Sequence, residues 1–65
     1  MNQGQATWIF SKCFEREYVR YSSEGRWRDG EEDKTPFICL DGNFSVEEVE
    51  AIAFLMRNKP EALRK

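Results

Sequence analysis

The segment from Phe44 to Val49 constrains the fold most strongly, because it combines several signals that begin an α-helix. Ser45 is a favourable N-cap residue, and Glu48, three residues later, can complete a capping box by accepting from the backbone N–H of Ser45. The apolar residues at the two ends of the segment have the spacing of a hydrophobic staple. Further along, Pro60 disfavours helical conformation in the residue before it. The sequence therefore predicts a helix over residues 46–58.

On a helical wheel, one arc of this predicted helix is apolar and is expected to face the core. Phe54 lies outside that arc, so we expect it either to be covered by residues 60–65 or to contact a partner, with neither outcome favoured. Ala51 and Leu55 widen the apolar part of the helix, and a helix with so wide an apolar surface is compatible with a homodimer. The predicted core face consists of Val46, Val49, Ile52, Ala53 and Met56.

The N-terminal third of the chain fits two patterns. As strands, residues 6–12 and 16–22 alternate in polarity, and residues 26–28 return as a short third strand after a turn at Glu24-Gly25. As a helix over residues 7–22, the same region has a nearly continuous apolar stripe. The aromatic content favours strands, and the helix is the alternative.

The middle of the chain is predicted to be a loop followed by a strand. Residues 29–36 combine a turn dipeptide, a run of acids and a proline, which is typical of a loop. Residues 37–40 are continuously apolar, which predicts a strand that is buried on both faces or central in its sheet. The predicted fold class is α+β: a small antiparallel sheet of three to four strands, packed by one C-terminal helix over 46–58.

The length of 65 residues suits one small domain, with residues 1–5 and 61–65 expected to fray. Apolar residues make up 40% of the chain and aromatic residues 14%, which indicates a packed core rather than disorder. No apolar run has the length of a membrane span, and the N-terminus lacks the features of a signal peptide. We therefore expect a cytoplasmic protein that does not contact membranes.

The chain has no histidine and two cysteines, which limits its chemistry. Two thiols without another soft ligand cannot complete a zinc site within one chain, so no metal or cofactor is predicted. For Cys13 and Cys39, two buried free thiols are favoured over a disulfide. With no histidine base, no glycine-rich phosphate loop and no activated nucleophile, the sequence predicts a protein that is not an enzyme.

Charge is unevenly distributed along the chain, although the net charge is only −2. Residues 1–28 contain five basic and three acidic side chains, residues 29–50 contain one basic and eight acidic, and residues 51–65 contain four basic and one acidic. An acidic isoelectric point near 5.1 argues against a protein whose main role is to coat nucleic acid.

The favoured functional hypothesis is a non-enzymatic regulator or inhibitor that binds a protein partner. Acidic residues of the loop and of the first helical turn would orient the complex and speed association, and aromatic residues would act as anchors. Binding would block the partner sterically or electrostatically. The predicted partner-binding residues are Trp27, Asp29, Glu31, Glu32, Asp33, Glu47, Glu50 and Phe54.

The alternative hypothesis is a nucleic-acid-binding module. In the strand interpretation, basic and aromatic side chains alternate on one sheet face, an arrangement that can stack bases and contact phosphates. Nearby acids dilute the positive field, and the same aromatics could instead face the core. The residues of this alternative site are Lys12, Arg16, Tyr18, Arg20, Arg26 and Arg28.

Overall fold

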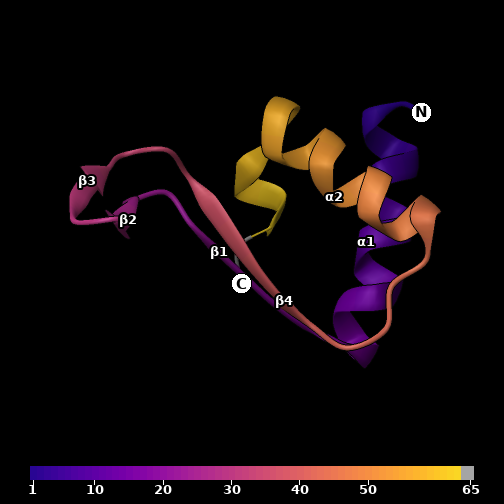
Figure 1. Cartoon of the computed structure of the whole chain (residues 1–65). Helices are drawn as coiled ribbons and strands as arrows, with labels where there is room; N and C mark the ends of the chain where they lie inside the picture. Colours follow the sequence, from indigo (N-terminus) through magenta and orange to yellow (C-terminus); the bar gives the residue numbers. More distant parts are fainter. Residues whose placement is uncertain (64–65) are drawn as a thin grey trace.

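The computed structural model, which describes residues 1–63, has an α+β fold, as the sequence predicts (Figure 1). Two helices lie side by side, and a long β-ribbon runs past them and projects beyond them. No helix in this part of the chain is both long enough and apolar enough to span a membrane. In chain order the elements are α1 (Gln3–Arg16), β1 (Tyr18–Ser22), β2 (Arg26–Arg28), β3 (Glu31–Asp33), β4 (Phe37–Asp41), α2 (Val46–Asn58) and the 3₁₀-helix η1 (Pro60–Leu63).

Helix α1 replaces the predicted strand over residues 6–12, so that prediction is wrong. The helical alternative is correct up to Arg16 but extends too far, because residues 18–22 form β1. Asn2 caps α1 by accepting from the backbone N–H of Gln5 at 2.8 Å. Residues 3–5, expected to fray, belong to this helix. Its buried residues recur at helical spacing and contact α2: Ala6, Ile9, Phe10 and Cys13.

The four strands form one long antiparallel hairpin with a gap in its ladder. β1 pairs with β4, and β2 pairs with β3. Ser22 and Arg26 are four positions apart in the sequence. Their cross-strand partners, Phe37 and Asp33, are also four positions apart, so both ladders share one register. The ribbon therefore continues through the gap without gaining or losing a residue on either side.

The reversal of the chain occurs at Asp29-Gly30, which corrects the prediction of a turn at Glu24-Gly25. Asp29 and Gly30 have φ values of 52° and 81°, and two consecutive left-handed residues match the right-handed twist of a two-residue hairpin. Gly25 also has a positive φ of 79°, but it lies between β1 and β2 on one side of the ribbon. Consequently β2 pairs with β3 rather than returning along β1, and part of the predicted loop 29–36 is strand.

Helix α2 has the predicted bounds and the predicted capping box. The backbone N–H of Glu48 donates to Ser45 Oγ at 3.2 Å, and that of Ser45 donates to Glu48 Oε1 at 2.8 Å. The predicted core face is wrong in part: Val46 is 75% exposed and Val49 is 46% exposed. Ile52 is buried as predicted, but its buried neighbours are Ala51 and Leu55, because the side of α2 that packs against α1 carries these residues.

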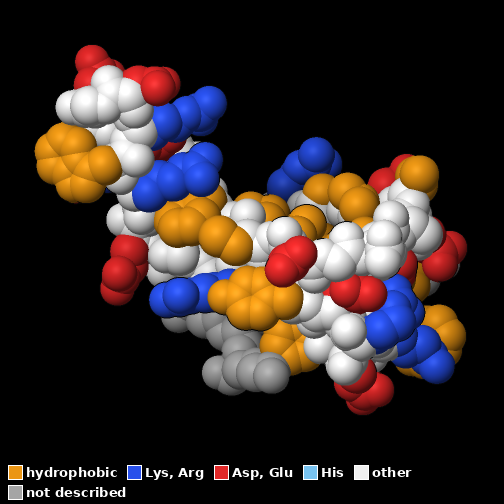
Figure 2. Space-filling view, turned by 60° about the horizontal axis from the view of Figure 1, so that its bottom comes forward, with side chains coloured by type: hydrophobic (Ala, Val, Ile, Leu, Met, Phe, Trp, Pro, Cys, Tyr) orange, Lys and Arg blue, Asp and Glu red, His pale blue; other side chains and the backbone are white. Residues whose placement is uncertain are grey.

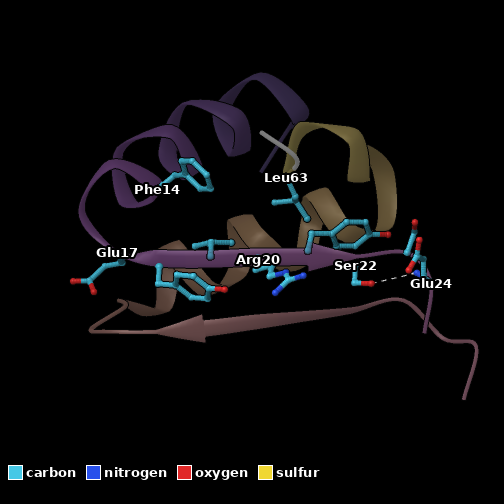
Figure 3. Close-up of a pocket in the computed structure, with 10 residues that line it drawn as sticks. Phe14, Glu17, Arg20, Ser22, Glu24 and Leu63 are labelled. Carbon is cyan, nitrogen blue, oxygen red and sulfur yellow. Dashed lines mark hydrogen bonds between the residues drawn. The ribbon is translucent and has the colours of Figure 1, made fainter. Parts of the chain in front are cut away.

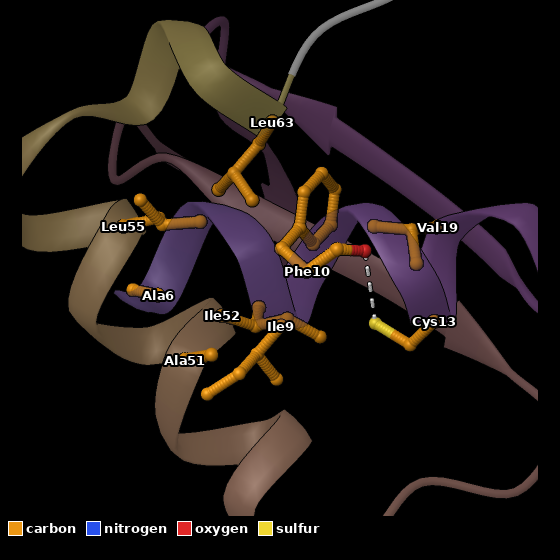
Figure 4. Packing of buried hydrophobic residues seen from close by; sticks show 9 residues of the cluster. All are labelled: Ala6, Ile9, Phe10, Cys13, Val19, Ala51, Ile52, Leu55 and Leu63. Atoms are coloured by element: carbon orange, nitrogen blue, oxygen red, sulfur yellow. Dashed lines mark hydrogen bonds between the residues drawn. The ribbon is translucent and has the colours of Figure 1, made fainter. Parts of the chain in front are cut away.

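The core lies between the two helices, β1 and η1 (Figure 4). Leu63 of η1 is buried in it, and Phe54 packs against it as a half-buried residue. Residues 64–65 of the tail that was expected to fray lie outside the described residues. The core cluster consists of Ala6, Ile9, Phe10, Cys13, Val19, Ala51, Ile52, Leu55 and Leu63.

Both cysteines are free, and only one is buried. Cys13 lies in the core, and its thiol donates to the Phe10 carbonyl at 3.3 Å. Cys39 is exposed, because β4 is neither central nor covered on both faces as predicted. It lies opposite Arg20 in the β1–β4 ladder.

Candidate functional site

The outer part of the ribbon, formed by β2 and β3 with the turn between them, projects from the body of the protein; we call residues 26–33 the arm (Figure 1). Trp27 is the apolar residue of the arm, and 74% of its surface is exposed. Its cross-strand neighbour is Glu32. A tryptophan this exposed on a projecting hairpin is unusual, because burial of a large aromatic side chain is strongly favourable.

The charges of the arm are paired across its two strands. Arg26 lies opposite Asp33, and Arg28 lies opposite Glu31. Alternation along a strand places these four residues on the face away from Trp27. Arg28 Nη1 is 4.0 Å from Asp33 Oδ2. Acidic side chains gather at the end of the arm, and basic ones lie nearer the body (Figure 2).

Asp33 is also held by the chain that follows it. The backbone N–H of Thr35 donates to Asp33 Oδ1 at 2.9 Å. Hydrogen bonds from Thr35 are the main cause that lowers the pKa of Asp33, and the nearby arginines lower it further. This carboxylate therefore remains charged at neutral pH and fixes the end of β3.

At the base of the arm, Arg26 turns toward β4. The Arg26 guanidinium carbon is 5.0 Å from the centroid of the Phe37 ring, within the range of a cation–π interaction. This contact bridges the gap between the two ladders of the ribbon. Arg26 is consequently directed to the body of the protein, while Trp27 points into solvent.

The predicted partner-binding residues fall into separate places. Trp27, Asp29, Glu31, Glu32 and Asp33 are together on the arm. Residues 47 and 50 are exposed on α2, whose first turn lies at the other end of the molecule from the arm (Figure 1). Residue 54 is half-buried against the core. The structure thus brings together the loop residues of the prediction but separates them from those of the helix.

The alternative nucleic-acid site is divided as well, because its first two residues are on a helix and not on a strand. Lys12 Nζ lies 4.6 Å from the centroid of the Trp8 ring on α1. Arg16 is bonded to Glu48, with 2.5 Å between Arg16 Nη2 and Glu48 Oε2. The prediction of one strand face containing all six residues is therefore wrong. Those on the ribbon are Tyr18, Arg20, Arg26 and Arg28.

A groove beside β1 was not predicted from the sequence. It has a volume of about 640 Å³ and is bordered by the end of α1, by β1 and by η1 (Figure 3). Phe14 and Leu63 point toward it from two different helices, and Glu17 and Glu24 lie at its opposite ends. The groove depends on α1 and η1 approaching the same strand, which no local sequence signal indicates.

Within residues 1–63, histidine, cysteine, aspartate and glutamate side chains form no group of three that could hold a metal ion. Burial raises the pKa of the Cys13 thiol, and the nearby Glu48 carboxylate raises it further, which favours the thiol over the nucleophilic thiolate. No protein-family model, curated protein or solved structure matches the chain. Among the described residues, the arm combines the most exposed aromatic side chain, Trp27, with four carboxylates and two arginines.

Proposed function

We propose that this protein is a small non-enzymatic regulator or inhibitor that binds a protein partner through the arm, with Trp27 as the anchor. The observation that carries the proposal is the 74% exposure of Trp27 on a hairpin that projects from the body. Tryptophan is enriched among the residues that contribute most to binding at protein interfaces. Insertion of its side chain into a partner would recover the burial that the folded monomer lacks.

The charges of the arm favour a partner with basic residues around its apolar pocket. The arm contains four carboxylates and two arginines. One arginine lies over Phe37, and the other lies near Asp33, so Glu32 remains beside Trp27 as an acidic neighbour. Complementary charge at the rim of an interface chiefly speeds association and selects the partner.

A comparison of two tryptophan variants tests the proposal. Trp27→Ala and Trp8→Ala each remove an exposed indole, with 74% and 63% of the residue exposed, but only Trp27 is on the arm. Immobilised wild-type protein and both variants would be exposed to an extract of the native host, and retained proteins quantified by mass spectrometry. We expect partners kept by the wild type and by Trp8→Ala to be lost with Trp27→Ala.

Calorimetry with the purified partner then measures the effect. Loss of an anchoring tryptophan is expected to weaken binding by about 2 kcal/mol or more, roughly thirtyfold. Circular dichroism should show the same melting temperature for Trp27→Ala as for the wild type, because the side chain is exposed. Equal retention of partners by Trp27→Ala and the wild type would reject the arm as the binding site.

Binding to single-stranded nucleic acid is the second candidate, supported by the ribbon face that carries Tyr18 and Arg20. These residues lie on the side of β1 opposite the buried Val19. Fluorescence anisotropy with random-sequence oligonucleotides at several salt concentrations distinguishes the two functions. Phosphate contact predicts an affinity that falls steeply as salt rises, and Arg20→Ala should weaken it; the protein-binding proposal predicts no measurable affinity at moderate salt.

A further inference from the structure

The edge of β4 that faces away from β1 is unpaired in the described part of the chain. β4 pairs with β1 along one edge, and no other strand among residues 1–63 joins that sheet. Figure 3 shows β4 on the side of β1 away from α1 and η1. Along such an edge, backbone N–H and C=O groups are available to a further strand.

The composition of β4 favours strand addition. Natural proteins protect exposed edges with lysine, proline or a bulge, but residues 37–40 are Phe-Ile-Cys-Leu and contain no charge. Their pairing with β1 is continuous from Phe37 to Asp41. Cys39 and Leu40 are exposed. The edge is thus apolar, regular and accessible, which are the properties that permit an additional strand to pair.

We propose that β4 pairs antiparallel with β4 of a second copy, so that two ribbons join into one four-stranded sheet. A two-fold axis through Cys39 places each Cys39 opposite the other, Ile38 opposite Leu40, and Phe37 opposite Asp41. Ile38 then meets an apolar partner, Leu40, and no like charges are directly opposed.

Charge complementarity supports a second copy rather than an unrelated strand. Arg26 lies 5.0 Å from the Phe37 ring centroid. Pairing centred on Cys39 brings Asp41 of the second copy opposite Phe37, and hence toward Arg26. The two-fold axis repeats this approach at the other end of the interface. Symmetric pairings centred on Ile38 or Leu40 do not place Asp41 opposite Phe37, so the charges select one register.

This inference goes beyond the proposed function and does not depend on it, because Trp27 is not in the new interface. Two five-residue strand edges form an interface smaller than the roughly 1,600 Å² of a standard protein complex, so we expect association at high protein concentration. Sedimentation velocity under reducing conditions, from roughly 10 µM to 1 mM, should show a monomer that converts to a dimer. Trp27→Ala should dimerise like the wild type.

Charges introduced at position 39, on the two-fold axis, test the register. Cys39→Lys and Cys39→Glu each place like charges opposite one another and should weaken dimerisation by roughly threefold or more. A mixture of the two variants should associate more strongly than either alone. Cys39→Ser should retain dimerisation, and Val46→Lys, which adds a charge at a 75% exposed site on α2, is the matched control.

Oxidation provides a second measurement. Opposed Cα atoms of antiparallel strands are about 4.5–5.5 Å apart, within the range that a disulfide can bridge. In a Cys13→Ser background, diamide should accept the two electrons and two protons of two Cys39 thiols and yield a covalent dimer. The proposal would be overturned if the protein were monomeric at every concentration, or if Val46→Lys weakened association as much as the charged Cys39 variants. It would also be overturned if mixing Cys39→Lys with Cys39→Glu did not restore association.

Discussion

Arg16, the last residue of α1, donates a hydrogen bond from Nη2 to Oε2 of Glu48 in the first turn of α2, at 2.5 Å. The same carboxylate accepts from the backbone N–H of Ser45 at 2.8 Å. One side chain therefore both caps α2 and joins it to α1. Although Arg16 is largely exposed, the side chain of Glu48 is only 15% exposed. Residues 32 positions apart in the sequence thus meet at the start of α2.

This contact predicts a loss of stability in acid. Hydrogen bonds from Ser45 and then from Arg16 lower the pKa of Glu48 below its ordinary value of 4.5. A lowered folded-state pKa contributes stability above the unfolded value, and that contribution is lost as the pH falls through the folded value. Urea unfolding from about pH 7 to about pH 2 should show a steeper decline below 4.5 for the wild type than for Glu48→Gln. Parallel curves would contradict the prediction.

The buried face of α2 is tested by two truncations on the same helix. Leu55 is fully buried, so Leu55→Ala should lower the free energy of unfolding by about 2–5 kcal/mol. Val46 is exposed, so Val46→Ala should change it by less than about 0.5 kcal/mol. Equilibrium urea unfolding measures both. A similar loss of unfolding free energy in the two variants would instead support the core face predicted from the helical wheel.

Two glycines of the ribbon should differ in their tolerance of alanine. A Cβ at Gly25 would meet the Asp33 backbone oxygen at 2.3 Å, whereas one at Gly30 would meet nothing within 4 Å. Both have positive φ, so both variants pay a strain of roughly 1 kcal/mol. Only Gly25→Ala must also displace β3. Amide exchange by NMR should show loss of protection across the arm in Gly25→Ala and near-normal protection in Gly30→Ala.

The thiols should react at very different rates. Cys39 is exposed, while Cys13 is buried and has a raised pKa. With Ellman's reagent at neutral pH, Cys13→Ser should react rapidly and Cys39→Ser should react only as fast as the protein unfolds. Urea should abolish the difference. Rapid modification of Cys13 in the native protein would show that α1 opens from α2 readily.

Local signals explain the parts of the fold that could be predicted. Ser45 and Glu48 specify the start of α2 through bonds only three residues apart, so no distant contact is required. Asp29-Gly30 signalled a turn, but its identity as the hairpin reversal depends on the strands that flank it. For the site, Trp27 and the acids of the arm were predicted together, because they are adjacent in the sequence.

The errors arise where two patterns fit the same residues. Phe10 and Cys13 satisfy both a strand and a helix pattern, and packing of α1 against α2 decides for the helix. The apolar run from Phe37 to Leu40 resembles a buried strand, yet β4 is half-buried at most, because the helices cover only part of the ribbon. A short apolar run does not reveal how many neighbours its strand has.

The sequence alone therefore determined the bounds of α2, its cap, and the acidic, tryptophan-bearing character of residues 26–33. These depend on hydrogen bonds and turn preferences between residues a few positions apart. Only the tertiary structure decided the ribbon register, the buried face of α2 and the bond between Arg16 and Glu48. Each of these depends on free energy gained when distant segments meet. A chain of 65 residues has a single core, so the packing of that core decides all three at once.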